Sequence, residues 1–366
     1  MRRPAAGGLQ AGPVIRCGEG VCVNARPRVS IGLPVYNGEP YLAQSIEALL
    51  SQSYEDFELI ISDNASTDGT ADLCLGYKKS DPRIHYIRQP RNIGLAPNHN
   101  FVVQQARGEF FKFAAADDLY GRNLLECCVS ALDEHPQVVL AQSYAGSIDG
   151  DSKVTQTYEY PLATDLPRAP DRFRSILFGS SGMFTKKGID VRGIVNDDND
   201  GIIRAEDSYG VIRADVLRKV APLGSYHHAD RILICEIALH GPFHTTPQWL
   251  HFRREYPGRA YRAQPTVHGR CAILDPARAS KLRHPALRLI AEYFWGYIAA
   301  IRRAPLSHAE RRECYEYLGQ WIVNRAANRV IPNFTQASRK LLPGTAGEIT
   351  AASEQAVVPD QARRLP

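Results

Sequence analysis

Apolar and polar positions alternate in blocks along the first part of the chain. From about residue 28 to residue 144, short runs rich in β-branched and aromatic residues are separated by longer amphipathic stretches. The short runs predict strands at 29–33, 57–62, 84–88, 110–114 and 138–144, and the longer stretches predict helices at 41–52, 70–79, 96–106 and 122–135. Each helix is entered through Asn, Asp, Pro or Gly residues that suit a turn or a cap. This alternation is typical of a parallel sheet whose strands are joined by crossover helices.

A more irregular pattern follows. Residues 145–205 are rich in Asp, Gly and Pro, and their most polar tract is 196–201. We expect either a mobile loop over a site or a solvated surface loop here. An EF-hand is disfavoured because no Glu stands twelve positions after a suitable Asp. Beyond this segment the pattern predicts helices near 214–220 and 230–239, a strand near 243–252, and a helical region over 285–342.

Composition limits the classes of protein that fit. With 366 residues, 44% of them apolar and 23% charged, the chain is able to bury one large core or two smaller ones. The net charge of +5 is small and no long Lys/Arg block is present, so we expect no nucleic-acid partner. The longest apolar segment, 287–301, contains Arg288 and Glu292 and is shorter than the roughly 20 apolar residues of a membrane-spanning helix. We therefore expect no transmembrane helix.

The chain ends and the cysteines bear on targeting and on the redox state of the compartment. Residues 1–27 hold no apolar run of the length found in a signal peptide, so we expect a floppy extension there, and a disordered tail over 344–366. The eight cysteines are scattered, without the spacing of a metal site or the density of a disulfide scaffold. Reduced thiols in a cytoplasmic protein are the simplest interpretation.

Polar clusters follow three of the predicted strands, at 34–38, 63–69 and 117–118. In open α/β sheets, ligands bind at the carboxyl ends of the strands, so we expect these clusters to converge. Asp117 and Asp118 end an apolar strand, where adjacent carboxylates are costly unless a cation or hydrogen bonds compensate them. Mg²⁺ binds through one or two carboxylates plus substrate phosphates, so a metal bridging to a diphosphate suits this position. The alternative is a loop pair that caps a helix.

Asp63 closes the second strand and is the candidate for reading a nucleobase. An acceptor-only carboxylate can take the N–H of a pyrimidine or guanine ring. The alternative is an Asx-turn that starts the following loop. Neither a Walker loop nor a dinucleotide fingerprint follows the first strand, so the usual cradles for ATP or NAD are missing.

Together these clusters resemble glycosyltransferase family 2, a large group of enzymes with the GT-A fold. The residues that carry the resemblance are Pro34, Val35, Tyr36 and Asn37, then 62–70, then Asn92, Ile93, Gly94 and Asn98, then Ala116, Asp117 and Asp118. The resemblance implies a Rossmann-like, mainly parallel mixed sheet with helices on both faces, followed by a helical C-terminal extension. We expect a GT-A domain over 28–265 and the helical region over 266–343.

The resemblance also implies a donor site. Its nucleotide-sugar-binding residues are expected to be Pro34, Tyr36, Asn37, Asp63, Asn92, Gly94, Asn98 and Asp117. Asp63 is expected on the base, and Asp117 and Asp118 on the ribose and on Mg²⁺ or Mn²⁺. The fuller family motif has an acidic residue two positions before Asp117, where this chain has Ala115. The donor is expected to be a UDP-, GDP- or dTDP-sugar, and the acceptor is unknown.

A thinner resemblance covers 210–217, 229–233 and 240–243. In the family, an acidic residue at the position of Asp230 opens a helix below the acceptor and serves as general base; a helix cap is the alternative role. A carboxylate within reach of the acceptor hydroxyl can take its proton as it attacks the anomeric carbon. One base with a metal-stabilised leaving group predicts inversion, since retention through a covalent intermediate would need a nucleophilic carboxylate.

Basic residues after the last predicted strand complete the expectations. His251, Arg253 and Arg254 are candidates for phosphate or acceptor contacts, with surface charge as the alternative. The stretch 281–303 mixes Arg and Lys with Leu, Ile, Phe and Trp, so it could rest on an anionic membrane surface, although packing on its own domain is the favoured interpretation. Two other functions stay open: a nucleotidyltransferase, and a degenerate transferase domain that binds a nucleotide without turnover.

Overall fold

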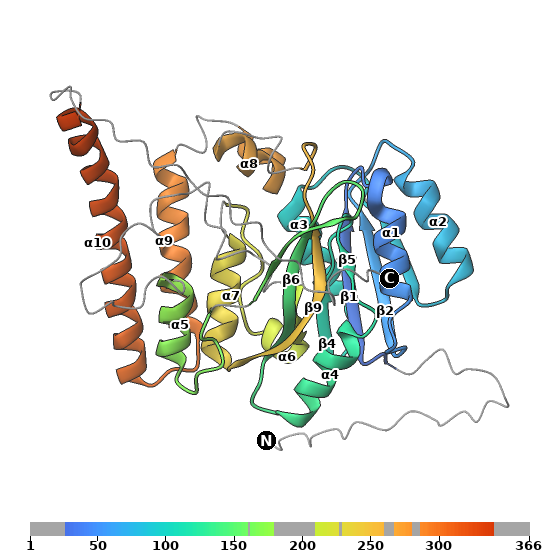
Figure 1. The fold of residues 1–366 in the computed structure, drawn as a ribbon, viewed down its shortest axis with the longest axis horizontal. Helices are drawn as coiled ribbons and strands as arrows, with labels where there is room; N and C mark the ends of the chain where they lie inside the picture. Colours follow the sequence, from blue (N-terminus) through green and yellow to red (C-terminus); the bar gives the residue numbers. More distant parts are fainter. Residues whose placement is uncertain are drawn as a thin grey trace, which may run out of the picture.

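The computed structural model describes residues 26–159, 162–178, 209–226, 229–259, 267–279 and 286–339. Within them, nine strands form one sheet in the order β3-β2-β1-β4-β8-β6-β9-β5, and β7 pairs with β6 (Figure 1). The sheet has a parallel half built by the first part of the chain and a mixed half built by later strands.

The parallel half holds four strands in the order expected for a doubly wound sheet. They are β3 (Ile84–Arg88), β2 (Phe57–Asp63), β1 (Val29–Val35) and β4 (Phe110–Phe113). Strands β1 and β2 are almost wholly buried, because helices cover both faces of this half of the sheet. The chain runs outward from β1 to β2 and β3, and then returns to place β4 on the other side of β1.

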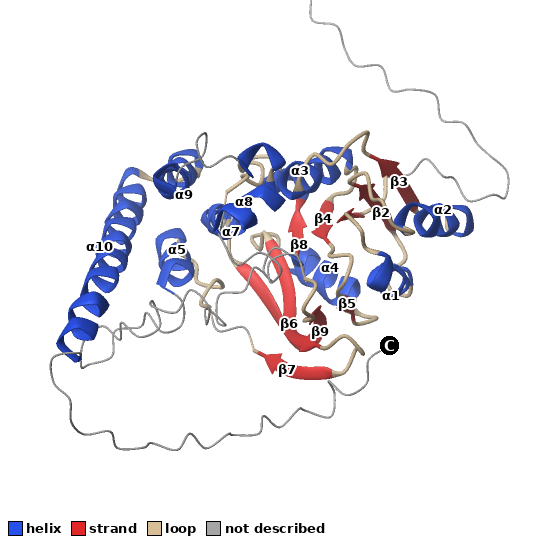
Figure 2. Ribbon diagram, turned by 90° about the horizontal axis from the view of Figure 1, so that it is seen from above, coloured by secondary structure: helices blue, strands red, loops and turns tan. Residues whose placement is uncertain are grey.

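Helices cover the two faces of the sheet unequally. One core cluster joins β1 and β2 to α1 (Glu39–Leu50), α2 (Thr70–Ser80) and α4 (Leu124–Glu134). The other face carries α3 (Leu95–Gln105), whose Val102 packs with Phe111 of β4. Seen from above, α1 and α4 lie on one side of the sheet and α3 on the other (Figure 2).

The mixed half extends the sheet beyond β4. Strand β8 (Val211–Arg213) is antiparallel to both β4 and β6 (Leu140–Ile148). Strand β9 (Phe243–Arg254) runs parallel to β6, with register shifts around Tyr144, and pairs at its far end with β5 (Leu119–Tyr120). This pairing brings the end of β9 beside the segment that follows β4.

Later helices build a layer beyond the sheet. They are α6 (Ala214–Leu217), α7 (Ala229–His240), α8 (Val267–Leu274), the 3₁₀ turn η4 (Pro276–Ala279), α9 (Ala286–Arg303) and α10 (His308–Arg339). Figure 1 shows α9 and α10 on the far side of α7 from the sheet. Tyr297 of α9 and Trp321 of α10 belong to the same core cluster as Phe111 of β4. The C-terminal helices and the sheet therefore share one continuous core, although the predicted limit near residue 265 stays a prediction.

The irregular segment expected over 145–205 is the main correction. Strand β6 continues to Ile148, a short strand β7 (Val154–Tyr158) pairs with it, and α5 (Ala169–Phe178) packs against α7 and α10. Helix α5 buries Phe173, Ile176 and Leu177, a spacing of three and four residues that favours an amphipathic helix. The polar tract 196–201 and the two expected floppy ends, apart from residues 26 and 27, lie outside the described residues.

The side chains described are consistent with two of the compositional expectations. The six cysteines within the described residues are free thiols. None of the helices in that part of the chain combines the length and the apolar character needed to span a bilayer.

Candidate active site

The site is built where the strand order reverses between β1 and β4. The parallel register pairs Val35 of β1 with Asp63 of β2, so the segments that follow these strands leave the sheet at the same edge. Gly32 pairs with Phe113, and the Ala114 N–H donates to Gly32 O at 2.8 Å, which carries the chain after β4 to that edge as well. The three polar clusters predicted from the sequence therefore converge.

The loop after β1 is fastened to the loop after β2. Asn37 adopts a left-handed φ of 50°, which Asn tolerates better than most residues. Its backbone N–H donates to Ser66 Oγ at 2.9 Å, and its Oδ1 accepts the Thr67 N–H at 2.9 Å. Tyr36 next to it is 49% exposed. An exposed aromatic ring on a braced loop is suited to stacking on a planar ligand.

Asp63 is fully buried and hydrogen-bonded within the protein. Oδ1 accepts the Ser66 N–H at 2.8 Å, and Oδ2 accepts the Tyr86 hydroxyl at 2.8 Å. Arg88 Nε lies 3.8 Å from Oδ2. Burial, with Asp63 as its acceptor, raises the pKa of Tyr86, so that hydroxyl keeps its proton. Asp63 thus makes the turn contact that the sequence left as an alternative. A nucleobase would have to share Oδ2 or replace Tyr86.

Asn92, Gly94 and Asn98 form a brace behind this loop. Asn92 Oδ1 accepts from the Gly94 N–H at 2.9 Å and from Asn64 Nδ2 at 3.0 Å. Asn98 is buried and makes two bonds with Ser62, accepting its hydroxyl and donating to its carbonyl. Gly94 has a φ of 93°, and a Cβ there would lie 2.6 Å from the carbonyl oxygen of Leu274. The described contacts of these residues position the loops.

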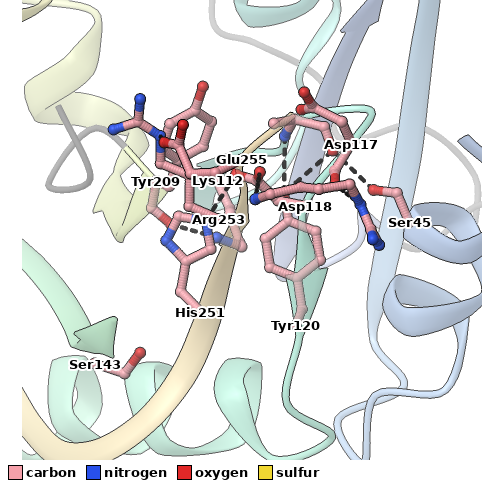
Figure 3. A network of polar contacts seen from close by, with 12 residues as sticks. Ser45, Lys112, Asp117, Asp118, Tyr120, Ser143, Tyr209, His251, Arg253 and Glu255 are labelled. Carbon is pink, nitrogen blue, oxygen red and sulfur yellow. Dashed lines mark hydrogen bonds and ion pairs between the residues drawn. The ribbon is translucent and has the colours of Figure 1, made fainter. Parts of the chain in front are cut away.

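Asp118 faces inward from the segment after β4. It is fully buried; Oδ2 lies 3.0 Å from His251 Nε2, and Oδ1 accepts the Arg254 N–H at 3.0 Å (Figure 3). The His251 ring in turn stacks on Tyr120, with ring centroids 5.5 Å apart. Burial opposes ionisation of Asp118, but the His251 hydrogen bond and charge, with smaller contributions from Arg259 and the Arg254 N–H, hold its pKa below the ordinary value.

Asp117 is more accessible, with 21% of its side chain exposed. Its Oδ2 accepts the Tyr256 hydroxyl at 3.2 Å and lies 4.0 Å from Arg259 Nε. Burial raises the pKa of Asp117 and the neighbouring Asp118 carboxylate raises it further, while Arg259 and Tyr256 oppose that shift without cancelling it. The pair therefore holds one firmly ionised carboxylate and one that gains from an added cation.

The basic residues at the end of β9, which the structure extends to Arg254, have unequal surroundings. The buried Arg254 guanidinium lies 4.3 Å from the Tyr41 ring centroid. Its three nitrogens donate to Asp117 O, Asp149 O, Gly150 O, Ser152 Oγ and Gln44 Oε1. Arg253 Nε pairs with Glu255 Oε1 at 3.2 Å. In this arrangement Arg254 holds the segment after β4, and His251 holds Asp118.

Sequence reasoning missed three residues of the site: Lys112, Tyr256 and Arg259. Lys112 is fully buried in β4 and donates to the backbone carbonyl of Tyr209, and burial lowers its pKa to about 8. The sequence could have indicated Lys112, because a lone Lys inside an apolar strand needs a specific hydrogen-bond acceptor when it is buried. Tyr256 and Arg259 follow β9, and their place beside Asp117 depends on the pairing of β9 with β6 and β5.

Asp230 lies in the first turn of α7, in a part of the chain separate from the polar clusters that follow β1, β2 and β4. Its Oδ1 accepts the N–H of Arg231 at 2.9 Å. Arg231 donates to the carbonyls of Ile176 and Leu177, which ties the start of α7 to the end of α5. This position agrees with a first-turn acid stabilised by the helix dipole, and the role of general base stays a prediction.

A divalent cation fits this site through Asp117. Both oxygens of Asp118 already have partners, and Ala115 offers no side-chain ligand. Among the described side chains, no group of three or more His, Cys, Asp and Glu residues could hold a metal. A cation would therefore depend on Asp117, on water and on phosphate oxygens of a ligand, which is a common arrangement for Mg²⁺.

Comparison with known proteins shows similarity to glycosyltransferases over the first part of the chain. Residues 30–204 match the model of glycosyl transferase family 2. A Bacillus subtilis (strain 168) protein named as a teichuronic acid biosynthesis glycosyltransferase, TuaG, is 33% identical over 133 residues, which are 36% of this chain and 50% of TuaG. EpsE of the same organism, named as a glycosyltransferase, is 40% identical over 114 residues, which are 31% of this chain and 41% of EpsE. The chain thus spans half or less of the length of these relatives.

A solved structure shows the same architecture. The crystal structure of TarS 1–349 from S. aureus in complex with UDP matches with a TM-score of 0.53 and 16% identity, covering 80% of this chain and 70% of that one. At this identity the likeness shows the fold alone. The sheet order and the acidic pair after β4 define a protein of the GT-A class. Over residues 30–204 the chain is similar to glycosyl transferase family 2.

Proposed function

We propose that this protein transfers a sugar from a nucleoside diphosphate sugar to an acceptor hydroxyl, with inversion at the anomeric carbon. The observation that carries the proposal is the acidic pair Asp117–Asp118 at the switch point between β1 and β4, beside the loops that follow β1 and β2. In open α/β sheets, ligands bind outside the carboxyl ends of the strands at such a switch point. The match of residues 30–204 to the model of a glycosyltransferase family supports the reaction class.

The donor would lie across the loops after β1 and β2. Tyr36 offers an exposed ring, Asn37 braces the loop that carries it, and Pro34 lies near the end of β1 just before that loop. Asp63 would accept a nucleobase N–H through the remaining lone-pair capacity of its carboxylate. Asn92, Gly94 and Asn98 would act indirectly, by holding these loops in place.

The leaving diphosphate requires positive charge. Asp117 would hold Mg²⁺ or Mn²⁺, and such a cation supplies neutralisation of the charge that develops on the departing diphosphate. Asp118 would act through its neighbours, since His251 and the Arg254 N–H fix its carboxylate within the fold. The backbone of Asp117 is fixed as well, because its carbonyl accepts from Arg254 Nε at 2.9 Å.

Asp230 would remove the acceptor proton. A carboxylate in hydrogen-bond reach of the hydroxyl serves as general base for a direct displacement. Direct displacement by one base inverts the configuration at the anomeric carbon. The name of the relative TuaG supports an acceptor in cell-envelope polysaccharide synthesis.

A peripheral membrane contact through 281–303 is compatible with such an acceptor and remains a prediction. Trp295 of α9 is 60% exposed, whereas Tyr297, Ala300 and Ile301 are buried against the core. Residues 281–285 lie outside the described ones. The described part of α9 thus packs mainly on its own protein, as the favoured interpretation of its sequence expected.

A thermal-shift panel tests the donor site. UDP, GDP, dTDP, CDP and ADP are each added with and without Mn²⁺ to the wild type, to Asp117→Asn, and to the exposed control Asp72→Asn of α2. A ligand that binds the native state raises the unfolding midpoint by mass action. We expect a shift with one nucleotide that is smaller in Asp117→Asn and unchanged in Asp72→Asn. No shift with any nucleotide would contradict the donor site, and binding without donor turnover would favour the degenerate module.

A further inference from the structure

The basic residues around the acidic pair do not contact Asp117 and Asp118 equally. His251 and a backbone N–H serve Asp118, and the Arg254 guanidinium serves five acceptors in the protein. Neither side chain is directed at a ligand. Asp117, which accepts a hydrogen bond from the Tyr256 hydroxyl and lies 4.0 Å from Arg259 Nε, is therefore the carboxylate whose charge is less fully compensated.

Arg259 is the cation that stands next to Asp117. Its Nε lies 4.0 Å from Asp117 Oδ2, and 15% of its side chain is exposed. Within the described part of the chain, its guanidinium makes one hydrogen bond, from Nη1 to Glu255 Oε1 at 3.0 Å. A guanidinium has five N–H donors in a planar fork that matches phosphate oxygens. Most of the donor capacity of Arg259 is therefore available to a ligand.

Electrostatics keep this arginine charged at the site. A guanidinium stays protonated in proteins, and the carboxylates of Asp117 and Glu255 lie 4.0 and 3.0 Å from that of Arg259. Glu255 accepts its hydrogen bond from the opposite end of the guanidinium. The arginine thus rests between two carboxylates, 4.0 Å from the atom on which a divalent cation would bind.

Ala115 limits the number of carboxylates at the site. Its backbone is fixed, because its N–H donates to the Tyr120 hydroxyl at 2.7 Å and its carbonyl accepts the Ser45 hydroxyl at 2.7 Å. Its side chain adds no carboxylate to this rigid turn. A site with one accessible carboxylate and a resident guanidinium attracts a divalent cation more weakly than a site with two free carboxylates.

We propose that Arg259 is a diphosphate-binding residue of the donor site and supplies part of the positive charge that a metal would otherwise provide. A nucleoside diphosphate consequently binds without divalent metal, through the guanidinium fork, and added metal strengthens binding only modestly. This inference rests on the proposed function, because the diphosphate of the donor is the ligand.

Isothermal titration of the full chain tests the proposal with UDP, GDP, dTDP and inorganic pyrophosphate, each in EDTA and in Mn²⁺. Arg259→Gln removes the charge, Arg259→Lys keeps the charge without the fork, and the exposed Arg122→Gln is the matched control. In EDTA we expect Arg259→Gln to weaken binding roughly ten- to a hundredfold, the worth of a charge-assisted hydrogen bond. Arg259→Lys should fall between it and the wild type, and Arg122→Gln should match the wild type.

A second variant keeps the test independent of how Arg259→Gln folds. Ala115→Asp adds a carboxylate at the family position and should increase the ratio of affinities in Mn²⁺ and EDTA at least severalfold. Wild-type binding that requires Mn²⁺, or equal EDTA affinities of wild type and Arg259→Gln, would overturn the role of Arg259 and leave the donor site intact. Absence of binding by any nucleotide in either condition would overturn both.

Discussion

Asp118 and His251 form a buried pair, with carboxylate Oδ2 3.0 Å from imidazole Nε2. The pair joins the segment after β4 to the end of β9, two parts of the chain that are 133 residues apart. It also separates the roles of two adjacent carboxylates: Asp118 is committed to the fold, and Asp117 remains for a ligand.

Removal of His251 should destabilise the protein. His251→Phe leaves the Asp118 carboxylate buried with one partner, and loss of one member of a buried pair costs about 3 kcal/mol. Because the pKa of Asp118 lies below its ordinary value in the folded protein, its contribution to stability is present above that ordinary value and is lost as the pH falls through the folded pKa. Urea unfolding should show the largest deficit at pH 7, narrowing below about pH 4. An equal deficit at both pH values would contradict the assignment.

Neutralisation of Asp117 should stabilise the folded protein, which is the opposite of the effect expected for His251→Phe. The pKa of Asp117 is raised, so its ionised form opposes folding, and its contribution to stability is lost as the pH rises through the folded pKa. Asp117→Asn should raise the unfolding midpoint at pH 7 by about 2–4 °C while abolishing donor turnover. The gain should vanish at pH 3, where the carboxylic acid is neutral in both states. A lower midpoint at pH 7 would show that the pairing with Arg259 outweighs burial.

Much of this arrangement could be predicted from the sequence, and two physical reasons explain the parts that could not. Periodicity predicted the strands and helices of the parallel half within a few residues, because each buries a regular face. Their positions after the predicted parallel strands placed Asp63, Asp117 and Asp118 at one edge of the sheet. The partner of Asp117 was missed, because Arg259 reaches it through the long-range pairing of β9 with β6 and β5. No local pattern encodes that distance.

Short elements were hidden for a different reason. Strands β5, β7 and β8 are two to five residues long, too short for an alternating pattern to be distinguished from a loop. Helix α5 was concealed by the Asp and Pro residues around it. Arg254 was read as a phosphate contact because its charge is visible in the sequence, whereas its five protein acceptors come from segments distant in the chain.

Gly94 should resist substitution. Gly94→Ala places a Cβ 2.6 Å from the Leu274 carbonyl oxygen at a φ of 93°, so we expect a loss of about 2 kcal/mol in unfolding free energy. Gly76→Ala is the control: a Cβ there meets no atom within 4 Å, and in the helix α2 it should add about 0.5–1 kcal/mol. Denaturant unfolding of both variants checks the pair. Equal stability of the two would show that the backbone around Gly94 shifts at little cost.

The helical layer should be coupled to α7 through a buried charge. Glu236 of α7 is fully buried and accepts from Arg303 of α9 at 2.7 and 2.9 Å. Arg303→Ala would leave Glu236 with the Ala221 N–H and no cation, at a cost of about 2 kcal/mol, reduced from a fully buried pair because Arg303 is half-exposed. Arg302→Ala on the same helix is the control. An unchanged urea midpoint in Arg303→Ala would argue against this coupling.

Asp230→Asn separates binding from chemistry. Loss of a general base lowers the rate by about 10²–10⁴ while the donor site stays intact. We expect unchanged nucleotide binding in titration and a much smaller turnover number. A variant with wild-type turnover would exclude Asp230 as the base and return it to the role of a helix-capping acid.

The most direct test of the central claim is release of nucleoside diphosphate from UDP-, GDP- and dTDP-sugars, measured with Mn²⁺ for wild type and Asp117→Asn. Water is itself a hydroxyl nucleophile and can take the place of the acceptor, so the assay is run without an acceptor. The account predicts release from one donor class by the wild type and at least a hundredfold less by Asp117→Asn, within the range for loss of a charge-stabilising group. Equal release by both proteins, or release from no donor, would contradict it.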